Sequence, residues 1–268
     1  MKTYLLVGFT ILLGCNATAQ PADVPAERVT AFDHSVWTEL LEAHVRDGLV
    51  DYVAFQDNPK LAAYLDALAR TDPSGLSRDE QLAFWINAYN AQVIDLIQRH
   101  YPATSILKLT PIKVPGVNAH VPYINDVFKT QGGLVAGTFR TLDEIEHQII
   151  RPTFNESRIH FALNCAAISC PSLRAEAFVG SRLDAQLEEQ TQSFLLDTDQ
   201  NNFDVAERTA HVTKLMDWFA EDFGGNETAI QAFLAPYFSG FIQAALRDGK
   251  FKLKYQDYDW DLNDLNQR

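Results

Sequence analysis

The sequence predicts a mainly helical α+β fold, in a single domain with a small, largely antiparallel sheet. Most apolar segments repeat with the three-to-four-residue spacing of amphipathic helices, and only a few short runs have the pattern of strands. Hydrophobic residues make up 47% of the chain, and no low-complexity tract interrupts it. A chain of this size and composition can fill one sizeable core or two small ones.

The N-terminal segment has the pattern of an export signal. Lys2 precedes an apolar run over residues 4–13 that is too short to span a bilayer permanently but suits a signal-peptide core. Two processing sites follow. Leu-Leu-Gly-Cys at residues 12–15 resembles a lipobox, in which Cys15 would be lipidated. Ala-Thr-Ala at residues 17–19 is an Ala-x-Ala site, with cleavage after Ala19.

We therefore expect residues 1–19 to be a signal peptide, residues 20–31 a tether and residues 32–268 a single globular domain. The protein would be exported to the periplasm or held as an outer-membrane lipoprotein, and would meet the membrane only through the lipid on Cys15. The net charge of −13 disfavours binding to nucleic acid or to an anionic membrane surface, since neither supplies a counter-charge. The expected substrate or partner is a small molecule, a peptide, the cell wall or another protein. No sequence motif indicates a cofactor.

Residue spacing places the remaining elements. Ser77 with Glu80 and Thr141 with Glu144 have the spacing of capping boxes, which begin two of the helices. Helices are expected over residues 32–45, 59–70, 77–97, 141–151, 181–196, 214–223 and 228–234. Residues 49–55 have the pattern of a short extended piece, 158–163 of a buried strand, 251–255 of an edge strand and 101–140 of loops with one or two strands.

The helix over residues 77–97 is apolar on nearly every side, which is typical of a buried helix. Asn87 and Asn90 are three residues apart and therefore share one of its faces. A buried Asn side chain must find partners for its amide hydrogens and its carbonyl oxygen, and failure costs about 1–3 kcal/mol. Either both side chains bind a neighbouring loop to the helix, or one of them orients a catalytic residue or polarises a substrate carbonyl.

The helix over residues 141–151 carries Glu146 close to the middle of its apolar face, with His147 at the flank. A carboxylate in such a place needs an ion partner or must keep its proton. Arg151 lies too far around the helix to be the obvious partner, so a structural arrangement would need an Arg from elsewhere. Groups of this kind are also typical of active sites.

The segment 158–171 brings His160, Asn164 and Cys165 to the end of the expected strand. A Cys at such a turn favours a lowered thiol pKa and nucleophilic chemistry, especially where a helix begins beside it. The alternative is a disulfide between Cys165 and Cys170, which form an even pair in an oxidising compartment once Cys15 is lipidated or removed.

Two weaker alternatives use both sulfurs. A metal site would combine Cys165 and Cys170 with His147 and His160, but no second close pair of ligands supports the C-x4-C spacing. A thioredoxin-like dithiol is disfavoured because this spacing differs from C-x-x-C. We expect no metal in the site.

Four motifs in order resemble the core motifs of the domain-of-unknown-function 547 family. The likeness runs from about residue 75 to residue 225, and residues 37–52 resemble the family's usual lead-in. The motifs are Ala-Phe-Trp-Ile-Asn-Ala-Tyr-Asn-Ala at 83–91, Asp-Glu-Ile-Glu-His at 143–147 with Arg151, Arg-Ile-His-Phe-Ala-Leu-Asn-Cys at 158–165 with Ser-Cys-Pro at 169–171, and Trp-Phe-Ala-Glu-Asp-Phe at 218–223. The family name gives no activity. The resemblance implies a single cluster that is formed by Asn87, Asn90, Glu146, His147, His160, Asn164 and Cys165.

The leading hypothesis from these residues is a thiol-dependent hydrolase or acyltransferase of the cell envelope. Cys165 would be the nucleophile and His147 the general base, with Glu146 or an Asn orienting the base, on an amide or ester substrate. The alternative is a non-catalytic, lipid-anchored binding or scaffolding module, in which the polar groups form an internal network and a Cys165–Cys170 disulfide is a staple. Burial of these groups with no open pocket beside Cys165 would favour this alternative.

Overall fold

The computed structural model describes residues 31–109 and 126–267. The expected signal peptide and the expected tether up to residue 30 lie outside the described residues, as does part of the Pro- and Gly-rich region. The described residues form a mainly helical fold with small, largely antiparallel sheets, which confirms the expected class. No helix among them is long and apolar enough to cross a membrane.

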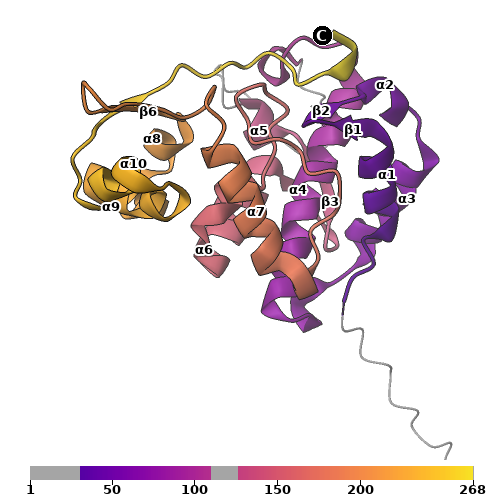
Figure 1. Ribbon diagram of the computed structural model, residues 1–268. Coiled ribbons are helices and arrows are strands. Elements are labelled where there is room, and N and C mark those ends of the chain that lie inside the picture. Colours follow the sequence, from indigo (N-terminus) through magenta and orange to yellow (C-terminus); the bar gives the residue numbers. More distant parts are fainter. Residues whose placement is uncertain (1–30, 110–125, 268) are drawn as a thin grey trace, which may run out of the picture.

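The first lobe is built around the long helix α4, Arg78–His100 (Figure 1). Helix α4 is buried along most of its length, as its apolar pattern predicts, and Ser77 Oγ accepts a hydrogen bond from the Glu80 N–H at 3.3 Å where the helix begins. The other elements of this lobe are α1 (Ser35–His44), β1 (Val45–Arg46), β2 (Leu49–Val50), α2 (Tyr52–Phe55), α3 (Pro59–Arg70), α5 (Asp126–Thr130), β3 (Gly132–Val135), β4 (Thr138–Thr141), α6 (Arg151–Phe154) and α7 (Leu183–Leu195).

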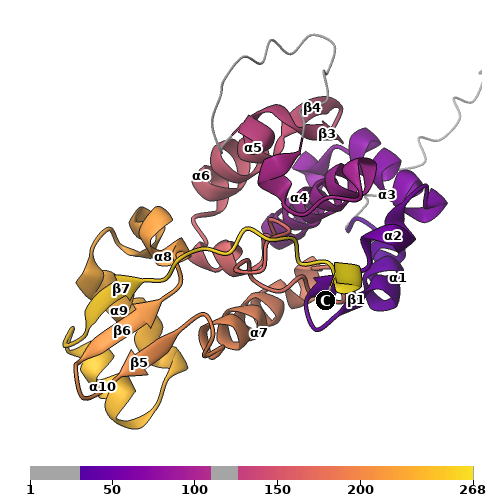
Figure 2. The same cartoon turned by 90° about the horizontal axis from the view of Figure 1, so that it is seen from above.

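The second lobe contains a three-stranded sheet in the order β5-β6-β7 (Figure 2). Strand β5 (Asn202–Asp204) is antiparallel to β6 (Thr209–Val212), whereas β7 (Lys252–Tyr255) is parallel to β6 and lies at the edge, where the sequence predicts it. The helices of this lobe are α8 (Leu215–Trp218), α9 (Glu227–Leu234) and α10 (Gly240–Arg247).

Each lobe has its own cluster of buried apolar side chains. The first cluster is centred on α4 and includes Trp37 and Phe84, and the second includes Met216 and Phe251. The short segment Ser157–Phe161 lies at their junction, because Ile159 belongs to the first cluster and Phe161 to the second.

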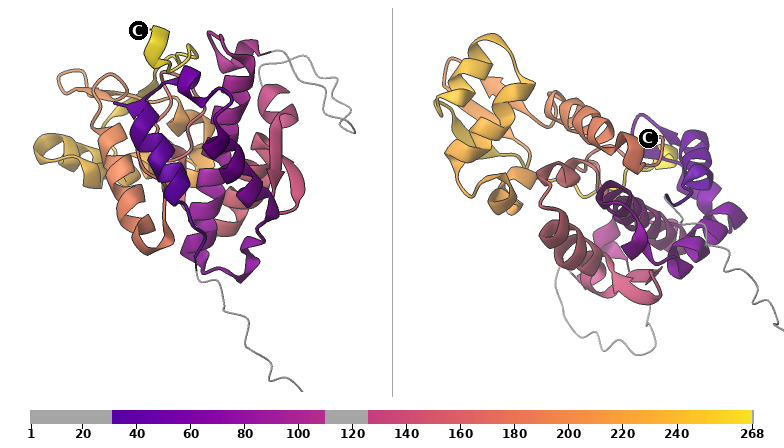
Figure 3. Two further views of the ribbon diagram at one scale, coloured as in Figure 1. Left: turned by 90° about the vertical axis from the view of Figure 1, so that its right-hand side faces the viewer. Right: turned by 90° about the horizontal axis from the view of Figure 1, so that it is seen from below.

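A C-terminal strap, residues 256–267, crosses back from the second lobe to the first, and its end lies beside the N-terminal helices (Figure 3). Backbone hydrogen bonds hold it there, from Ile168 N–H to Asp261 O at 2.9 Å and from Val50 N–H to Asn263 O at 2.9 Å. Asp264, fully buried, accepts a hydrogen bond from the hydroxyl of Tyr101 at 2.8 Å. The strap therefore fixes the position of one lobe against the other.

The expected strand over residues 158–163 is wrong, because the chain forms a 3₁₀ helix over Ser157–Phe161. The Glu156 side chain caps this helix by accepting from the Arg158 N–H at 3.1 Å, and it also pairs with the Arg158 guanidinium at 2.8 Å. A short apolar run has the same composition in a strand and in a buried turn, so its periodicity does not distinguish them.

The expected helix after Thr141 forms, but it is wider and longer than predicted. Both bonds of the capping box are present, from Glu144 N–H to Thr141 Oγ1 at 3.1 Å and from Thr141 N–H to Glu144 Oε2 at 2.9 Å. A π-helix then runs over Glu144–Ile150, and the chain continues through Pro152 into α6. The expected end before Pro152 is therefore wrong. The helix accommodates the proline because Pro152 stands in the first turn of α6, after the wide turn, where a missing N–H is tolerated.

The expected extended piece over residues 49–55 is correct only in its first part. Leu49–Val50 is the strand β2, but Asp51 then begins the short helix α2 by accepting a hydrogen bond from the Ala54 N–H at 3.3 Å. An Asp in this position is a helix N-cap. A helix of only one turn is too short to show an apolar repeat, so the sequence pattern does not reveal it.

Candidate active site

A cavity of about 670 Å³ lies where the two lobes and the C-terminal strap meet. Four of the seven predicted site residues line it, namely Glu146, His147, His160 and Cys165. They come from the π-helix and from the segment after it, and residues of α4, α5, α8 and the strap complete the walls. An open pocket therefore lies beside Cys165, whereas the absence of such a pocket would have favoured the binding-module alternative.

Glu146 is a carboxyl group on the cavity wall with little access to water. Its side chain is 13% exposed, and burial raises the pKa of its carboxyl to about 7. The positive charge of Arg151 and a hydrogen bond from the Tyr89 hydroxyl lower the pKa but offset only part of this effect. Near neutral pH the group therefore exists in both its protonated and its ionised form.

His160 and Asp222 form a pair behind Glu146. His160 Nε2 lies 2.6 Å from Asp222 Oδ2, and His160 Nδ1 lies 3.8 Å from Glu146 Oε1. Burial lowers the pKa of His160, and the hydrogen bond to Asp222 opposes this only in part. The pKa of Asp222 is held well below its usual range by the hydrogen bond from His160 and by the guanidinium of Arg151. A neutral His160 therefore donates its Nε2 hydrogen to the Asp222 carboxylate.

His147 lies at the rim of the cavity, and its side chain is 36% exposed. Its Nδ1 lies 3.1 Å from Nη1 of Arg151. Because a guanidinium group can only donate, Nδ1 must accept, and the neutral ring carries its hydrogen on Nε2, 3.9 Å from Asp143 Oδ1. His147 thus offers an N–H donor where the sequence hypothesis requires a lone pair. Among the described residues no hydrogen bond joins His147 to Cys165.

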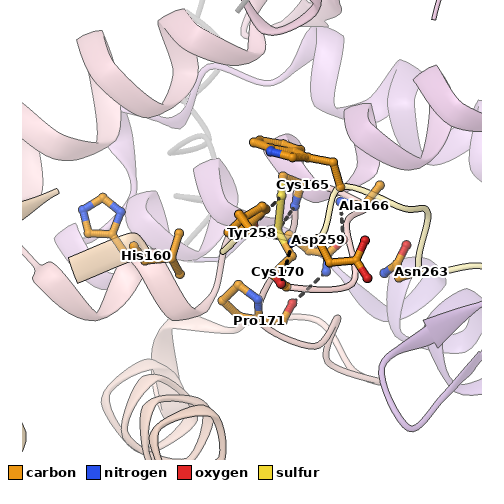
Figure 4. Close-up of a disulfide and its surroundings, with 12 residues drawn as sticks. His160, Cys165, Ala166, Cys170, Pro171, Tyr258, Asp259 and Asn263 are labelled. Atoms are coloured by element: carbon orange, nitrogen blue, oxygen red, sulfur yellow. Dashed lines mark hydrogen bonds between the residues drawn. A yellow bond between two sulfur atoms is a disulfide. The ribbon is translucent and has the colours of Figure 1, made fainter. Parts of the chain in front are cut away.

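Cys165 and Cys170 are joined by a disulfide (Figure 4). The Cys165 N–H donates to Cys170 Sγ at 2.7 Å, and the hydroxyl of Tyr258 lies 3.1 Å from Cys165 Sγ. A disulfide sulfur has no hydrogen, so the Tyr258 hydroxyl is the donor. Figure 4 shows Tyr258 beside the sulfurs and His160 apart from them. The protein therefore has the disulfide alternative of the sequence prediction, and Cys165 has no thiol in this state.

The metal site considered from the sequence would use Cys165, Cys170, His147 and His160. In the disulfide neither cysteine has a thiolate, so the two soft sulfur ligands of that site are not available to a metal ion. Within residues 31–109 and 126–267, no group of three or more His, Cys, Asp or Glu side chains is arranged to hold a metal ion.

The three predicted asparagines lie behind the cavity and bind backbone groups with both ends of their amides. Asn87 exchanges two bonds with Phe178, donating to its carbonyl at 2.7 Å and accepting from its N–H at 3.0 Å. Asn90 donates to the carbonyl of Ala162 at 3.0 Å and accepts from the Asn164 N–H at 2.9 Å. Asn164 then donates to the Pro171 carbonyl at 2.7 Å. This is the arrangement of the structural alternative, in which the amides of Asn87 and Asn90 hold the segments on either side of the disulfide loop against α4.

Several residues of the site were not predicted. Asp222 stands in the Trp-Phe-Ala-Glu-Asp-Phe motif at 218–223, and its place in this motif is the signal in the sequence that could have identified it. Tyr258 and Trp260 lie on the strap and reach the cavity only because the chain crosses back, which no local pattern indicates. Trp218, Tyr258 and Trp260 form an aromatic wall, with ring centroids 4.8, 4.6 and 5.8 Å apart.

Part of the chain matches a protein-family model. Residues 73–195 match the family described as "Protein of unknown function, DUF547". The matched segment contains the first three motifs and ends before the fourth, at residues 218–223. No curated protein and no solved structure was found to match the chain. Residues 73–195, which supply α4, Glu146, the two histidines and the disulfide, therefore belong to the domain-of-unknown-function 547 family.

Proposed function

We propose that this protein is a hydrolase of ester or amide bonds in which Glu146 is the general base and then the general acid. The observation that carries the proposal is the Glu146 carboxyl, which lines an open cavity and has its pKa raised by burial to about 7. A carboxyl with a pKa near the working pH can both accept and return a proton, which is the requirement for such a role. Perturbed groups of this kind in a cleft are typical of active sites.

The reaction is a proton cycle on one carboxyl group. Ionised Glu146 takes a proton from a water molecule as the water oxygen forms its bond to the substrate carbonyl carbon. The protonated carboxyl then gives this proton to the leaving oxygen or nitrogen as the bond from carbon to the leaving group breaks. Charge on the carbonyl oxygen would be stabilised by a donor on the cavity wall, such as the Nε2 hydrogen of His147.

Two neighbours of Glu146 support this role by acting on its carboxyl group. The hydroxyl of Tyr89 donates to the Glu146 carboxyl and so favours its ionised form. The His160 ring, which is 1% exposed, packs behind Glu146 and is held in one tautomer by Asp222. Tyr89, His160 and Asp222 are therefore positioning residues for Glu146.

The thiol-dependent hydrolase or acyltransferase remains a proposal for the reduced protein only. Attack by Cys165 requires cleavage of its bond to Cys170 and a base with a lone pair directed at the sulfur. The Glu146 reaction requires neither step, so it needs fewer changes from the described state.

A substrate screen tests the proposal. The full chain would be incubated with 4-nitrophenyl esters and aminoacyl 4-nitroanilides, without a reductant, beside Glu146→Gln and the control Glu39→Gln, whose carboxyl is 58% exposed and remote from the cavity. We expect Glu146→Gln to lose turnover by at least about 100-fold, the lower range for one acid–base group. The control should keep wild-type activity. Equal turnover by Glu146→Gln would rule out the role of Glu146, and turnover that requires a reductant would favour the thiol reaction.

A non-catalytic binding module is the second candidate. The disulfide favours it, and so do the amides of Asn87, Asn90 and Asn164, each of which donates to one backbone group and accepts from another, since a staple and an internal network are what it requires. A ligand that saturates the cavity of the wild-type protein and is never turned over would support this candidate.

We also propose that the protein is exported. The apolar run over residues 4–13 supports this, and so does the disulfide, because such bonds persist in oxidising compartments. Mass spectrometry of the protein made in a bacterial host would give the mature N-terminus. A lipidated Cys15 would support the lipoprotein form, cleavage after Ala19 would support the periplasmic form, and an intact N-terminus would rule out both.

A further inference from the structure

The aromatic wall gives the cavity one apolar side, whose rings are tilted against one another by 30 to 51°. Trp218 from α8 and Tyr258 and Trp260 from the strap have ring centroids 4.6 to 5.8 Å apart. Rings at this separation contact one another, so no ligand group fits between them and the three form one continuous surface. Phe128 of α5 extends it, with its ring centroid 6.4 Å from that of Trp260. A ligand with a flat apolar face can stack against such a surface.

Lys129 stands next to Phe128 and also lines the cavity. The other cation of the cavity, Arg151, already has an ion partner within the protein, because it binds Asp222 through Nε and Nη2, and it binds His147 through Nη1. Within the described part of the chain, no carboxylate lies within ion-pair distance of Lys129. Burial is the largest cause of the lowered pKa of His147, and the positive charge of Lys129 is the smallest of the causes that contribute to it.

An uncommitted ammonium group in a cavity is the complement of an anionic ligand group. The chain as a whole carries a net charge of −13, so its general field repels anions. A ligand anion would therefore need a local cation, and Lys129 is placed to supply it at the border of the aromatic wall.

We propose that the substrate of this site is an anionic acyl compound, with a carboxylate or phosphate bound by Lys129 and a flat apolar face held on the wall of Trp218, Tyr258 and Trp260. The term substrate rests on the hydrolase function proposed for Glu146. The binding of the ligand does not depend on turnover and can be measured separately.

The test compares pairs of probes of similar shape, in which one member is an anion and the other is neutral. Benzoate and benzamide form the first pair and have an aromatic ring, whereas D-glucuronate and D-glucose form the second pair and have a sugar ring. Comparison of the two pairs shows whether the wall prefers an aromatic face or a sugar face. Binding would be followed by the quenching of tryptophan fluorescence, to which Trp218 and Trp260 contribute. Wild-type protein should bind at least one anion more tightly than its neutral counterpart. Lys129→Met should lower the affinity for that anion by about tenfold or more, whereas its affinity for the neutral probe should stay the same.

Lys252→Met is the matched control, because Lys252 is exposed on β7 and does not line the cavity. This variant should bind the anion like the wild type. Trp218→Ala should lower the affinity for both members of the preferred pair, since it removes part of the aromatic wall that both probes contact. Equal affinities for the anion and its neutral counterpart, an unchanged anion affinity in Lys129→Met, or no saturable binding of either anion would overturn the proposal.

The same measurements separate this inference from the hydrolase function. Glu146→Gln should still bind the anion, because Lys129 and the aromatic wall are intact. Binding that depends on Lys129 in a protein that turns over no ester or amide would overturn the hydrolase function alone. If turnover depends on Glu146 but is the same in Lys129→Met and the same for charged and neutral substrates, the proposal of an anionic substrate alone is overturned.

Discussion

Nε2 of His160 lies 2.6 Å from Oδ2 of Asp222, and this contact joins the two lobes. The same carboxylate accepts two bonds from Arg151 of the first lobe, at 2.6 and 3.0 Å. One aspartate of the second lobe therefore holds both the ring behind Glu146 and the guanidinium at the cavity rim. The polar wall of the cavity, which is formed by Glu146, Arg151 and His160, therefore depends on the docking of the lobes.

Asp222→Asn should destabilise the protein and loosen the polar wall. The change leaves Arg151 without its ion partner in a place where both side chains are only about a quarter exposed, at 27% and 26%. We expect the free energy of unfolding to fall by about 2 kcal/mol, below the value for a fully buried pair. The control is Asp217→Asn in the same segment, whose exposed pair with Lys214 is worth less than about 1 kcal/mol. Urea unfolding of both variants gives the comparison, and equal losses would contradict this account of Asp222.

Glu146→Gln should change how stability depends on pH. The unfolded carboxyl titrates near its ordinary pKa of about 4.3, whereas the folded pKa is about 7. Between these values the folded protein holds a proton that the unfolded chain has lost, so this group lowers stability as the pH rises. The loss approaches about 4 kcal/mol above pH 7, at about 1.4 kcal/mol for each unit of pKa difference.

Gln does not titrate, so the variant lacks this loss. Its free energy of unfolding relative to the wild type should therefore rise from pH 4 to pH 8, as measured by urea unfolding at several pH values. Glu39→Gln, on the exposed surface, should follow the wild type throughout. A constant difference between Glu146→Gln and the wild type across this range would show that the folded carboxyl has an ordinary pKa.

The disulfide should protect both cysteines from alkylation and add modest stability. Without a reductant, iodoacetamide should label neither Cys165 nor Cys170, and reduction should release both, as read by mass spectrometry of their peptides. The double variant Cys165→Ser, Cys170→Ser should lose about 2 kcal/mol, the chain-entropy value for so short a loop. Rapid labelling of Cys165 alone, with an apparent pKa well below about 8.5, would instead restore the nucleophile hypothesis.

Asn90→Ala should be strongly destabilising, because Asn90 is 3% exposed and binds two backbone groups, of Ala162 and Asn164, in the segment that leads into the disulfide loop. Each partner left buried without a hydrogen bond costs about 1–3 kcal/mol, so we expect a loss of about 3 kcal/mol. Asn202→Ala, on the exposed face of β5, is the matched control and should change stability by less than about 0.5 kcal/mol. A loss below 1 kcal/mol for Asn90→Ala would show that the amide does not hold the loop.

Local patterns predicted much of the fold. Helix α3 begins at Pro59 and Ser77 caps α4, where the sequence places them, because capping and apolar spacing act over a few residues. The failures have a different cause. The run at residues 158–163 is buried at the junction of two cores, and burial gives a strand and a 3₁₀ turn the same apolar composition.

The candidate site could be predicted only in part, for a related reason. Glu146 and His147 stood out because a polar pair on an apolar helix face is visible in the sequence. Asp222, Tyr258 and Trp260 reach the cavity through the docking of the second lobe and the return of the strap, which are long-range events. The use of Asn90 and Asn164 as backbone partners likewise depends on which loop packs against α4.

The most direct test of the central claim is the pKa of Glu146 itself, which requires no substrate. Protein labelled with ¹³C at the side-chain carboxyl of glutamate would be titrated by NMR from pH 3 to pH 9, beside Glu146→Gln. We predict one carboxyl resonance that titrates near pH 7 and is missing in the variant. If every glutamate carboxyl titrates below about pH 5, or if the resonance near pH 7 persists in Glu146→Gln, Glu146 is not the acid–base group of this cavity.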